Sequence, residues 1–410
     1  MFLLPFLLAY KNPVVLLPPF YGTNLWATYN QTNLPWYCDK KQDDKLLWLS
    51  TSYMGPLKMK CLFKMLTTFI DDNDNIVNWP NVSINIHDFG GDESASYVVQ
   101  SERFNKKFEP SMKNLVDHFT NLGWELKKDL FIAPYDWRIA PTFSDDFWPQ
   151  LKKLIEQAYD VEKQKVTLIG FSLGGYMIQQ FLSKHCDSAE WKEKYISQCI
   201  LISPSFAGDI QMLYNLWSKR IPTFPVLHFD ALSNCIEHMP SVHAHIPNEI
   251  IYSDVVLAIG PDGREYKGKD LYSLIMEHLI NNENSRKIFD KSQLIRKEVP
   301  KDLGVKITLL MNSKRKTCVA LNFSKGFDKN PIRILGEGDG TMPAYGHRWV
   351  CKHFKNITCI DFKNTSKYYD HYPLISTKRV LDIVSNITYY NKIPDLENKE
   401  EFIGGNDEVD

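Results

Sequence analysis

The stretch Lys165–Gln180, KVTLIGFSLGGYMIQQ, constrains the fold more than any other part of the chain. It begins with alternating, β-branched residues typical of a buried strand, turns at a G-x-S-x-G pattern centred on Ser172, and continues with helix-compatible residues. This order predicts a nucleophile elbow, in which the serine Oγ is exposed at the carboxyl end of the strand. Gly170 and Gly174 flank the serine because a Cβ at either position would collide with a neighbouring element. The alternative is a tight turn in which Ser172 only caps the helix.

Short apolar segments alternate with amphipathic helices on both sides of the elbow. This alternation predicts a mostly parallel sheet covered by helices on both faces. The chain of 410 residues exceeds the usual size of a single core, so we expect a core over 12–395 that carries insertions. The predicted strands are 13–19, 82–89, 129–133, 166–169, 199–203, 305–310 and 356–362, and the predicted helices are 110–122, 149–158, 176–182 and one that Ser376 caps.

Two segments interrupt this pattern. Residues 36–77 mix aromatic and aliphatic residues with lysines and aspartates, and Cys38 and Cys61 bracket most of them. We interpret this segment as a disulfide-closed insert whose Trp and Leu side chains contact a lipid interface, where Trp is favoured. The alternative is an insert packed on the core.

Residues 206–300 have no regular alternation and are predicted to form a cap over the sheet. The cap segment contains four histidines, and their irregular spacing favours a surface role over a metal site. These histidines are His228, His238, His243 and His245.

A serine hydroxyl needs a base that is itself oriented by a third group. In α/β-hydrolases these groups follow the serine in the order acid, then histidine. Asp339, in the glycine-rich turn GEGDGT, and His371, between the last strand and the last helix, satisfy that order. The alternative bases are His347 and His353, and the alternative acids are Asp361 and Asp370. Asp136 and Arg138 are predicted to form a structural ion pair beneath the site.

An oxyanion hole needs two backbone N–H donors. One is expected at Leu173, the residue after the nucleophile. The other is expected from a glycine turn at an earlier strand end, either Phe89-Gly90-Gly91 or Phe20-Tyr21-Gly22. No metal or other cofactor is required by this chemistry.

Composition excludes some classes of function and favours one compartment. The net charge of −1 gives no support to nucleic-acid binding. The eight cysteines form no C-x-x-C pair, which disfavours zinc and redox motifs. The apolar N-terminus, MFLLPFLLAY, is a minimal signal peptide, a first strand or a truncated start. Six N-x-[ST] triplets favour the secretory pathway, either secretion or a lysosomal or vacuolar lumen, and their asparagines are Asn30, Asn81, Asn322, Asn356, Asn364 and Asn386.

Taken in order, the motifs of the chain resemble those of the lecithin:cholesterol acyltransferase family, which includes lysosomal phospholipase A and the phospholipid:diacylglycerol acyltransferases. APYDWR together with GDGT is specific to that family, whereas the elbow alone is not. The segments that carry the resemblance are PVVLLPPFYGTNL, the Cys38–Cys61 loop around Trp48, DFGG at Asp88–Gly91, APYDWRIAP at Ala133–Pro141, LIGFSLGG, GDGT at Gly338–Thr341 and the late histidine.

The resemblance implies an α/β-hydrolase with Ser172, Asp339 and His371 as its triad. It implies that Phe89 and Leu173 supply the oxyanion N–H groups, that Leu46, Leu47 and Trp48 contact membrane, and that a mobile lid lies around Leu232–Asn248. The implied activity moves a fatty acyl group from a glycerophospholipid to a sterol or similar lipid alcohol through an acyl-serine, at a peripheral membrane or lipoprotein surface. The alternative is a phospholipase A that releases the fatty acid to water.

The chain departs from the family pattern in three places. Phe171 stands where histidine is frequent in the family. The first turn reads Pro18-Pro19-Phe20-Tyr21-Gly22, whereas Pro-Gly is usual there. Cys351 fits a second family disulfide, but its usual partner is missing, which leaves Cys318 or Cys359. The departures affect the expected acceptor specificity rather than the chemistry.

Overall fold

The computed structural model describes residues 11–30, 34–101, 103–219, 230–391 and 401–403. Within them, a seven-stranded sheet forms the centre of the molecule, in the order β18-β17-β14-β11-β10-β1-β9. Neighbouring strands are parallel except for β17 and β18. In sheet order the strands are Glu401–Ile403, Ile357–Asp361, Ile307–Met311, Ile196–Ile202, Val166–Phe171, Val14–Leu17 and Leu130–Ile132.

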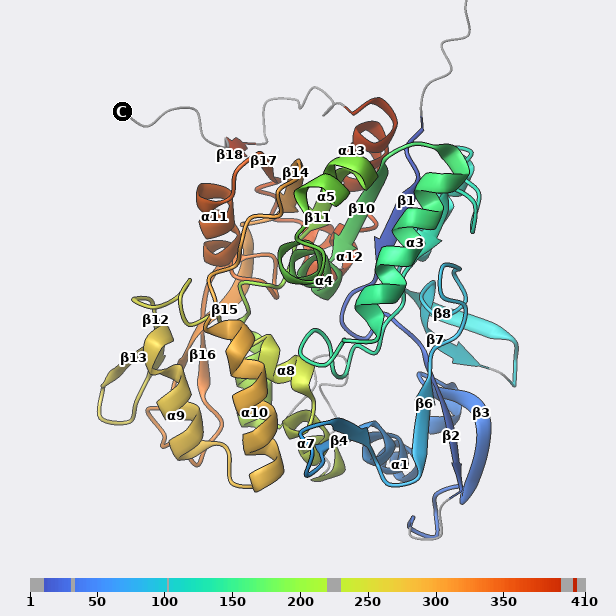
Figure 1. The fold of residues 1–410 in the computed structure, drawn as a ribbon. Helices are drawn as coiled ribbons and strands as arrows, with labels where there is room; N and C mark the ends of the chain where they lie inside the picture. Colours follow the sequence, from blue (N-terminus) through green and yellow to red (C-terminus); the bar gives the residue numbers. More distant parts are fainter. Residues whose placement is uncertain (1–10, 31–33, 102, 220–229, 392–400, 404–410) are drawn as a thin grey trace, which may run out of the picture.

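Helices cover both faces of this sheet (Figure 1). Alternate residues of each strand point to opposite faces, so Val14 and Leu16 join one apolar cluster while Val15 and Leu17 join the other. The first cluster includes α2 (Lys113–Asn121) and α13 (Lys378–Tyr390), and the second includes α3 (Phe147–Glu162) and α4 (Leu173–Gln180). The predicted α/β-hydrolase architecture with a mostly parallel sheet is therefore confirmed. The other helices near this sheet are the π-helical turn Phe181–His185, α5 (Ala189–Tyr195), α11 (Ala344–His353), the 3₁₀ turn Lys367–Tyr369 and α12 (His371–Leu374).

The predicted strand at 82–89 is shorter than expected and lies outside the central sheet. β6 (Val82–Asn85) pairs antiparallel with β2 (Leu25–Asn30), which also pairs with β3 (Lys41–Trp48). An alternating pattern reports only that one face of a strand is buried, so it fits this small sheet as well as the central one. The remaining elements of this region are the 3₁₀ turn Thr51–Tyr53, α1 (Pro56–Leu66), β4 (Thr68–Ile70), β5 (Ile76–Asn78), β7 (Tyr97–Ser101) and β8 (Lys106–Pro110).

The insert contains the predicted disulfide between Cys38 and Cys61, but the predicted membrane-contact residues are wrong. Leu46, Leu47 and Trp48 are 3%, 0% and 0% exposed. The Trp48 ring packs against Tyr21 and Trp137, and its Nε1–H donates to the Tyr21 carbonyl oxygen at 3.0 Å. The end of β3 is therefore part of the core, because its pairing with β2 turns these side chains inward.

The cap segment lies below the carboxyl ends of the central strands in Figure 1. Its strands β12 and β13 belong to a four-stranded sheet, β13-β12-β15-β16, whose other two strands follow residue 300. This second sheet is thus built from two separate parts of the chain. The elements are α6 (Ile210–Ser218), α7 (Asp230–Glu237), α8 (Pro240–Ala244), β12 (Val256–Ile259), β13 (Glu265–Lys267), the 3₁₀ turn Gly268–Asp270, α9 (Leu271–His278), α10 (Glu283–Arg296), β15 (Arg315–Asn322) and β16 (Ile332–Gly338).

The cap histidines do not have the predicted surface role. His238, His243 and His245 are 5%, 0% and 1% exposed, and His228 lies outside the described residues. Burial lowers the pKa of both His243 and His245 to about 4, so both rings are neutral near pH 7. The predicted lid, Leu232–Asn248, overlaps this buried segment, and its mobility stays a prediction.

Two further observations concern the chain as a whole. Cys351 pairs with Cys359, one of the two partners that the sequence left open, and Cys318 is free and buried. Among the described residues, no helix is both long and apolar enough to cross a lipid bilayer.

Candidate active site

Ser172 lies at a strained turn between β10 and α4. Its backbone has φ 54° and ψ −117°, a conformation rare for a residue with a side chain. A Cβ on Gly170 would lie 2.6 Å from the Gly174 backbone, and one on Gly174 would lie 2.0 Å from the Leu17 carbonyl oxygen. Only glycine fits at either position, because strand and helix approach each other this closely.

The structure brings the three predicted catalytic side chains together. His371 Nε2 lies 2.9 Å from Ser172 Oγ, and His371 Nδ1 lies 2.7 Å from Asp339 Oδ2. All three side chains are buried. The Nδ1–H donates to the carboxylate, which leaves Nε2 free to accept the serine proton. The arrangement is that of a nucleophile, a base and an orienting acid.

Asp339 accepts four further hydrogen bonds. Its Oδ1 accepts from the backbone N–H groups of Thr341 and Met342, at 2.9 and 2.6 Å. Its Oδ2 also accepts from the Ser203 hydroxyl, and its backbone carbonyl accepts from the His371 N–H at 2.7 Å. Burial alone would raise the pKa of Asp339, but the His371 imidazole and the hydrogen bonds from His371 and Ser203 keep this pKa below its usual value. The acid is therefore ionised where it faces the imidazole.

The alternative bases have other partners. His347 is buried, and its Nε2 lies 2.9 Å from the Pro204 carbonyl oxygen. His353 Nδ1 lies 2.7 Å from the Trp349 carbonyl oxygen at the exposed end of α11. Neither ring is among the hydrogen-bond partners of Ser172.

The alternative acids and the predicted ion pair also have structural roles. Asp361 accepts from the Ser313 N–H at 3.0 Å, and Asp370 pairs with Arg315. Arg138 Nη2 lies 2.6 Å from Asp136 Oδ2, as predicted, and it also donates to Asn78 Oδ1 at 2.7 Å. The pair thus fixes the loop after β9 rather than taking part in the chemistry.

The first oxyanion donor, the Leu173 N–H, lies at the start of α4 directly after the nucleophile. The second is not Phe89. Gly90 exchanges backbone hydrogen bonds with Ile132 on the outer side of β9, and both β9 and β1 lie between this turn and β10. Three strand spacings amount to about 14 Å, which is too far for a bond to an oxyanion beside Ser172.

The turn after β1 is correctly placed for the second donor. β1 pairs directly with β10, and Leu17 lies opposite Gly170. Pro19 has no N–H, so the first donor that follows is Phe20. Among the described residues, the Phe20 N–H has no hydrogen-bond acceptor. We therefore assign the second oxyanion position to Phe20, the alternative that the sequence had left open.

A buried Ser–His pair lies behind the nucleophile, and no pattern in the sequence indicates it. Ser205 Oγ lies 2.9 Å from His245 Nε2, and the Ser205 N–H donates to the Ser172 carbonyl oxygen at 3.2 Å. His245 Nδ1 lies 2.6 Å from the Ser241 carbonyl oxygen, and its ring packs 5.6 Å from the Phe20 ring. This pair links the cap to both sides of the proposed oxyanion hole.

Asp209, at the start of α6, is a second buried acid near the triad. Its Oδ1 accepts from the Met212 N–H at 2.6 Å, whereas its Oδ2 has no hydrogen-bond partner. Burial, the largest cause, raises the pKa of Asp209 to about 7. The ionised form is therefore costly in the folded protein.

We expect Asp209→Asn to stabilise the protein at pH 8 more than at pH 5. The folded-state pKa lies above the unfolded value, so the contribution of Asp209 to stability is full below about pH 4 and is lost as the pH rises through about 7. Asparagine caps a helix equally well and carries no charge. The expected gain at pH 8 is on the order of a few kcal/mol. Thermal unfolding of both proteins at the two pH values measures it, and equal effects at both would contradict it.

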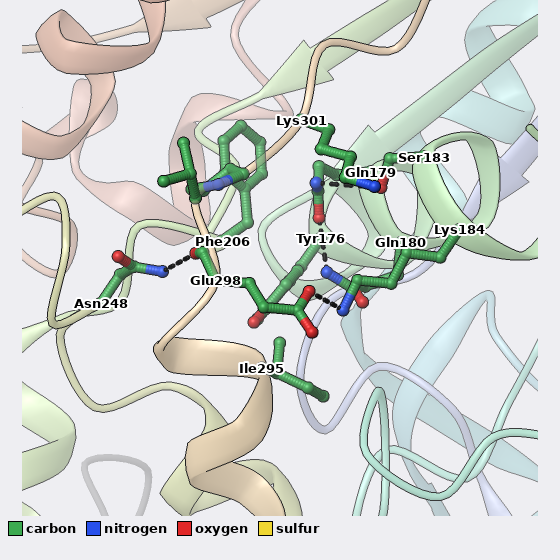
Figure 2. A pocket seen from close by; sticks show the side chains of 12 residues that line it. Tyr176, Gln179, Gln180, Ser183, Lys184, Phe206, Asn248, Ile295, Glu298 and Lys301 are labelled. Carbon is green, nitrogen blue, oxygen red and sulfur yellow. Dashed lines mark hydrogen bonds and ion pairs between the residues drawn. The ribbon is translucent and has the colours of Figure 1, made fainter.

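Figure 2 shows a small polar pocket beside α4, between Gln180 and Glu298. It has about 10 Å³ of space for the centre of a water molecule, which is close to the minimum for one bound water. The Asn248 side chain donates to the Glu298 carbonyl oxygen, and Lys184 pairs with the Glu298 carboxylate. The pocket is too small to hold an acyl chain.

Comparison with known proteins identifies the family of the chain. The family model described as lecithin:cholesterol acyltransferase matches residues 44–325. Phosphatidylcholine-sterol acyltransferase of Mus musculus is 24% identical over 387 residues, which are 92% of this chain and 85% of that protein. The lysosomal phospholipase A and acyltransferase of Bos taurus is 24% identical over 346 residues, or 83% of each chain.

A solved structure supports the fold alone. A chain in the crystal structure of the Tle4–Tli4 complex aligns with a TM-score of 0.50 at 12% identity, and the alignment covers 92% of this chain and 98% of that one. The family model covers most of the sequence, and its match agrees with the observed fold and with the elbow. The protein is a member of the lecithin:cholesterol acyltransferase family.

Proposed function

We propose that the protein moves a fatty acyl group from a glycerophospholipid to a lipid alcohol, such as a sterol, through an acyl-Ser172 intermediate. The observation that carries this proposal is the hydrogen-bonded series Ser172–His371–Asp339 beside two backbone donors. Membership of a family whose relatives are phosphatidylcholine-sterol acyltransferases and lysosomal phospholipases supports the lipid substrate.

In the first half-reaction, Ser172 Oγ attacks the ester carbonyl carbon as His371 Nε2 takes its proton. The oxyanion of the tetrahedral intermediate receives the N–H groups of Leu173 and Phe20. His371 then gives its proton to the departing lysophospholipid alcohol, which leaves the acyl-serine. In the second half-reaction an acceptor hydroxyl attacks, its proton passes to His371, and Ser172 is released with its proton restored.

The alternative is a phospholipase A, in which water is the acceptor. A single experiment separates the two. Liposomes of acyl-labelled phosphatidylcholine, with and without sterol, are incubated with the protein, and the products are resolved. We expect labelled sterol ester only when sterol is present. Free fatty acid alone in both cases would identify a phospholipase, and no product at all would contradict both forms of the proposal.

The insert over 36–77 still offers a lipid contact, but through different residues from those predicted. Trp36, Met54 and Leu57 are 85%, 42% and 47% exposed, and all three lie close in sequence to the Cys38–Cys61 disulfide or within its loop. Exposed Trp and aliphatic side chains favour a membrane interface. We propose these three as the apolar membrane contact of the insert, in place of the buried Leu46, Leu47 and Trp48.

We further propose that the protein works in the secretory pathway, either outside the cell or in a lysosomal or vacuolar lumen. Two disulfides support an oxidising compartment. Three of the six candidate glycosylation sites, Asn30, Asn81 and Asn356, are exposed, whereas Asn322, Asn364 and Asn386 are half-buried. The exposed three are the better acceptors.

A further inference from the structure

The hairpin formed by β7 and β8 projects from one side of the molecule (Figure 1). Residues 103–110 are all exposed, although β7 itself is largely covered. Phe104 at the turn and Phe108 on β8 are 65% and 45% exposed. One hairpin thus carries two Phe side chains that are each largely or partly open to solvent.

Three cations lie beside these two Phe residues in the sequence. Arg103, Lys106 and Lys107 lie between residues 103 and 108, a stretch without any acid, whereas Glu102 and Glu109 flank it in the sequence. The guanidinium of Arg103 lies 5.3 Å from the centre of the Phe104 ring. Among the described residues, none of the three cations forms an ion pair with a carboxylate. Their charge is therefore available to a partner outside the chain.

The base of the hairpin is anchored to the insert. The Leu49 N–H donates to the Val98 carbonyl oxygen at 3.2 Å, and the Gln100 N–H donates to the Leu49 carbonyl oxygen at 2.9 Å. Ser50 and Gln100 form a parallel bridge, so the start of the turn that leads to Met54 runs beside β7. The hairpin is thus held beside the segment that leads to the proposed apolar contact.

We propose that the tip of this hairpin, Arg103–Phe108, binds the surface of anionic phospholipid membranes. The two rings would enter the interface while the three cations remain at the level of the headgroups, the arrangement that favours binding of basic amphipathic elements. The inference rests on the proposed action on membrane phospholipid, and it adds a preference for negatively charged lipid that the catalytic site does not require.

An edge strand offers another explanation for the lysines. β8 pairs only with β7 in the described structure, and lysines on a free edge prevent pairing with a second chain. That role explains the charge of Lys106 and Lys107 but not the exposure of Phe104 and Phe108, because exposed aromatic rings on a free edge promote association. The membrane explanation accounts for both.

The test measures vesicle flotation of the full chain as Ser172→Ala, which cannot consume its substrate. Vesicles of phosphatidylcholine with and without phosphatidylserine are compared at low and high salt. We expect the protein to bind the anionic vesicles more tightly. We expect the affinity for these vesicles to fall roughly 30-fold in the double variant Lys106→Gln/Lys107→Gln. Phe104→Ser should weaken binding to both kinds of vesicle. The matched control is Lys352→Gln/Lys355→Gln at the end of α11, on the opposite side of Figure 1.

Several outcomes would overturn the proposal. These are equal binding to both kinds of vesicle, binding that is insensitive to salt, or an equal effect of the control variant. If the lysine variant only self-associates in light scattering and Phe104→Ser binds like its parent, the lysines protect an edge strand and the proposal is wrong. Because flotation uses an inactive protein, a failure to form sterol ester or fatty acid would contradict the proposed function without changing this result.

Discussion

Replacing Ser172 with alanine is expected to abolish labelling by a fluorophosphonate probe and to lower kcat/KM for ester cleavage by roughly 10⁴–10⁶-fold. The reason is that the proposed mechanism holds the acyl group covalently on Oγ, and among the described residues Oγ is the hydroxyl that lies within hydrogen-bond distance of His371 Nε2, at 2.9 Å. Intact-protein mass spectrometry after probe treatment measures the labelling, and a chromogenic short-chain ester measures the rate.

The control for this variant is Ser183→Ala. Ser183 is also a buried serine, in the π-helical turn that continues α4, and its Oγ accepts from the Gln179 side chain rather than contacting a histidine. We expect normal labelling and a normal rate. Probe attached to Ser172→Ala at the wild-type level would show that another residue is the nucleophile and would remove the basis of the proposed mechanism.

The second large effect is expected from removing the Phe20 N–H. The Gly22 N–H donates to the Pro19 carbonyl oxygen at 2.9 Å, and Tyr21 has φ 64°. A left-handed residue at the third position of such a turn is typical of type II, in which proline is common at the second position. Phe20→Pro therefore suits the turn but lacks the donor. We expect kcat to fall about 10²–10³-fold below that of Phe20→Ala.

The comparison with Phe20→Ala isolates the donor, because both variants lose the ring that packs against Trp137 and His245. Both variants should have similar thermal stability, because both lose the same ring. Probe binding to Ser172 reports that the elbow is intact. If the two variants have the same kcat, the Phe20 N–H does not bind the oxyanion.

Local patterns predicted the elements that carry the chemistry. The strand of the elbow, its two glycines and the following helix are specified by neighbouring residues, so Ser172 could be placed without knowing the rest of the fold. His371 followed from its place after the last parallel strand, because in a parallel sheet the loops after the strands meet at one edge. Asp339 followed only from the chain order of acid and histidine, since it comes after β16, which belongs to the four-stranded sheet. These inferences depend on residues close together in the sequence, on the order of the motifs or on the topology of a parallel sheet.

Where the sequence failed, the missing information was which segments are neighbours. The pattern of 82–89 shows that one face is buried but does not show which strand is its neighbour. The prediction of a central strand is therefore wrong, because β6 pairs with β2 in a small sheet, and Phe89 lies beyond β9 rather than beside the elbow. Leu46, Leu47 and Trp48 have the composition of a membrane loop, but pairing with β2 turns them into the core. His245 became buried because α8 and the loop after β11 close over it.

The sequence by itself therefore determined the candidate nucleophile, acid and base, the architecture and the family, since these depend on short-range sterics and on the order of motifs. Only the tertiary structure decided which glycine turn lies beside the elbow, which apolar side chains reach the surface and which histidines are neutral. The physical reason is that burial and lateral strand pairing are set by contacts between residues far apart in the chain, and these contacts leave no local periodicity to read.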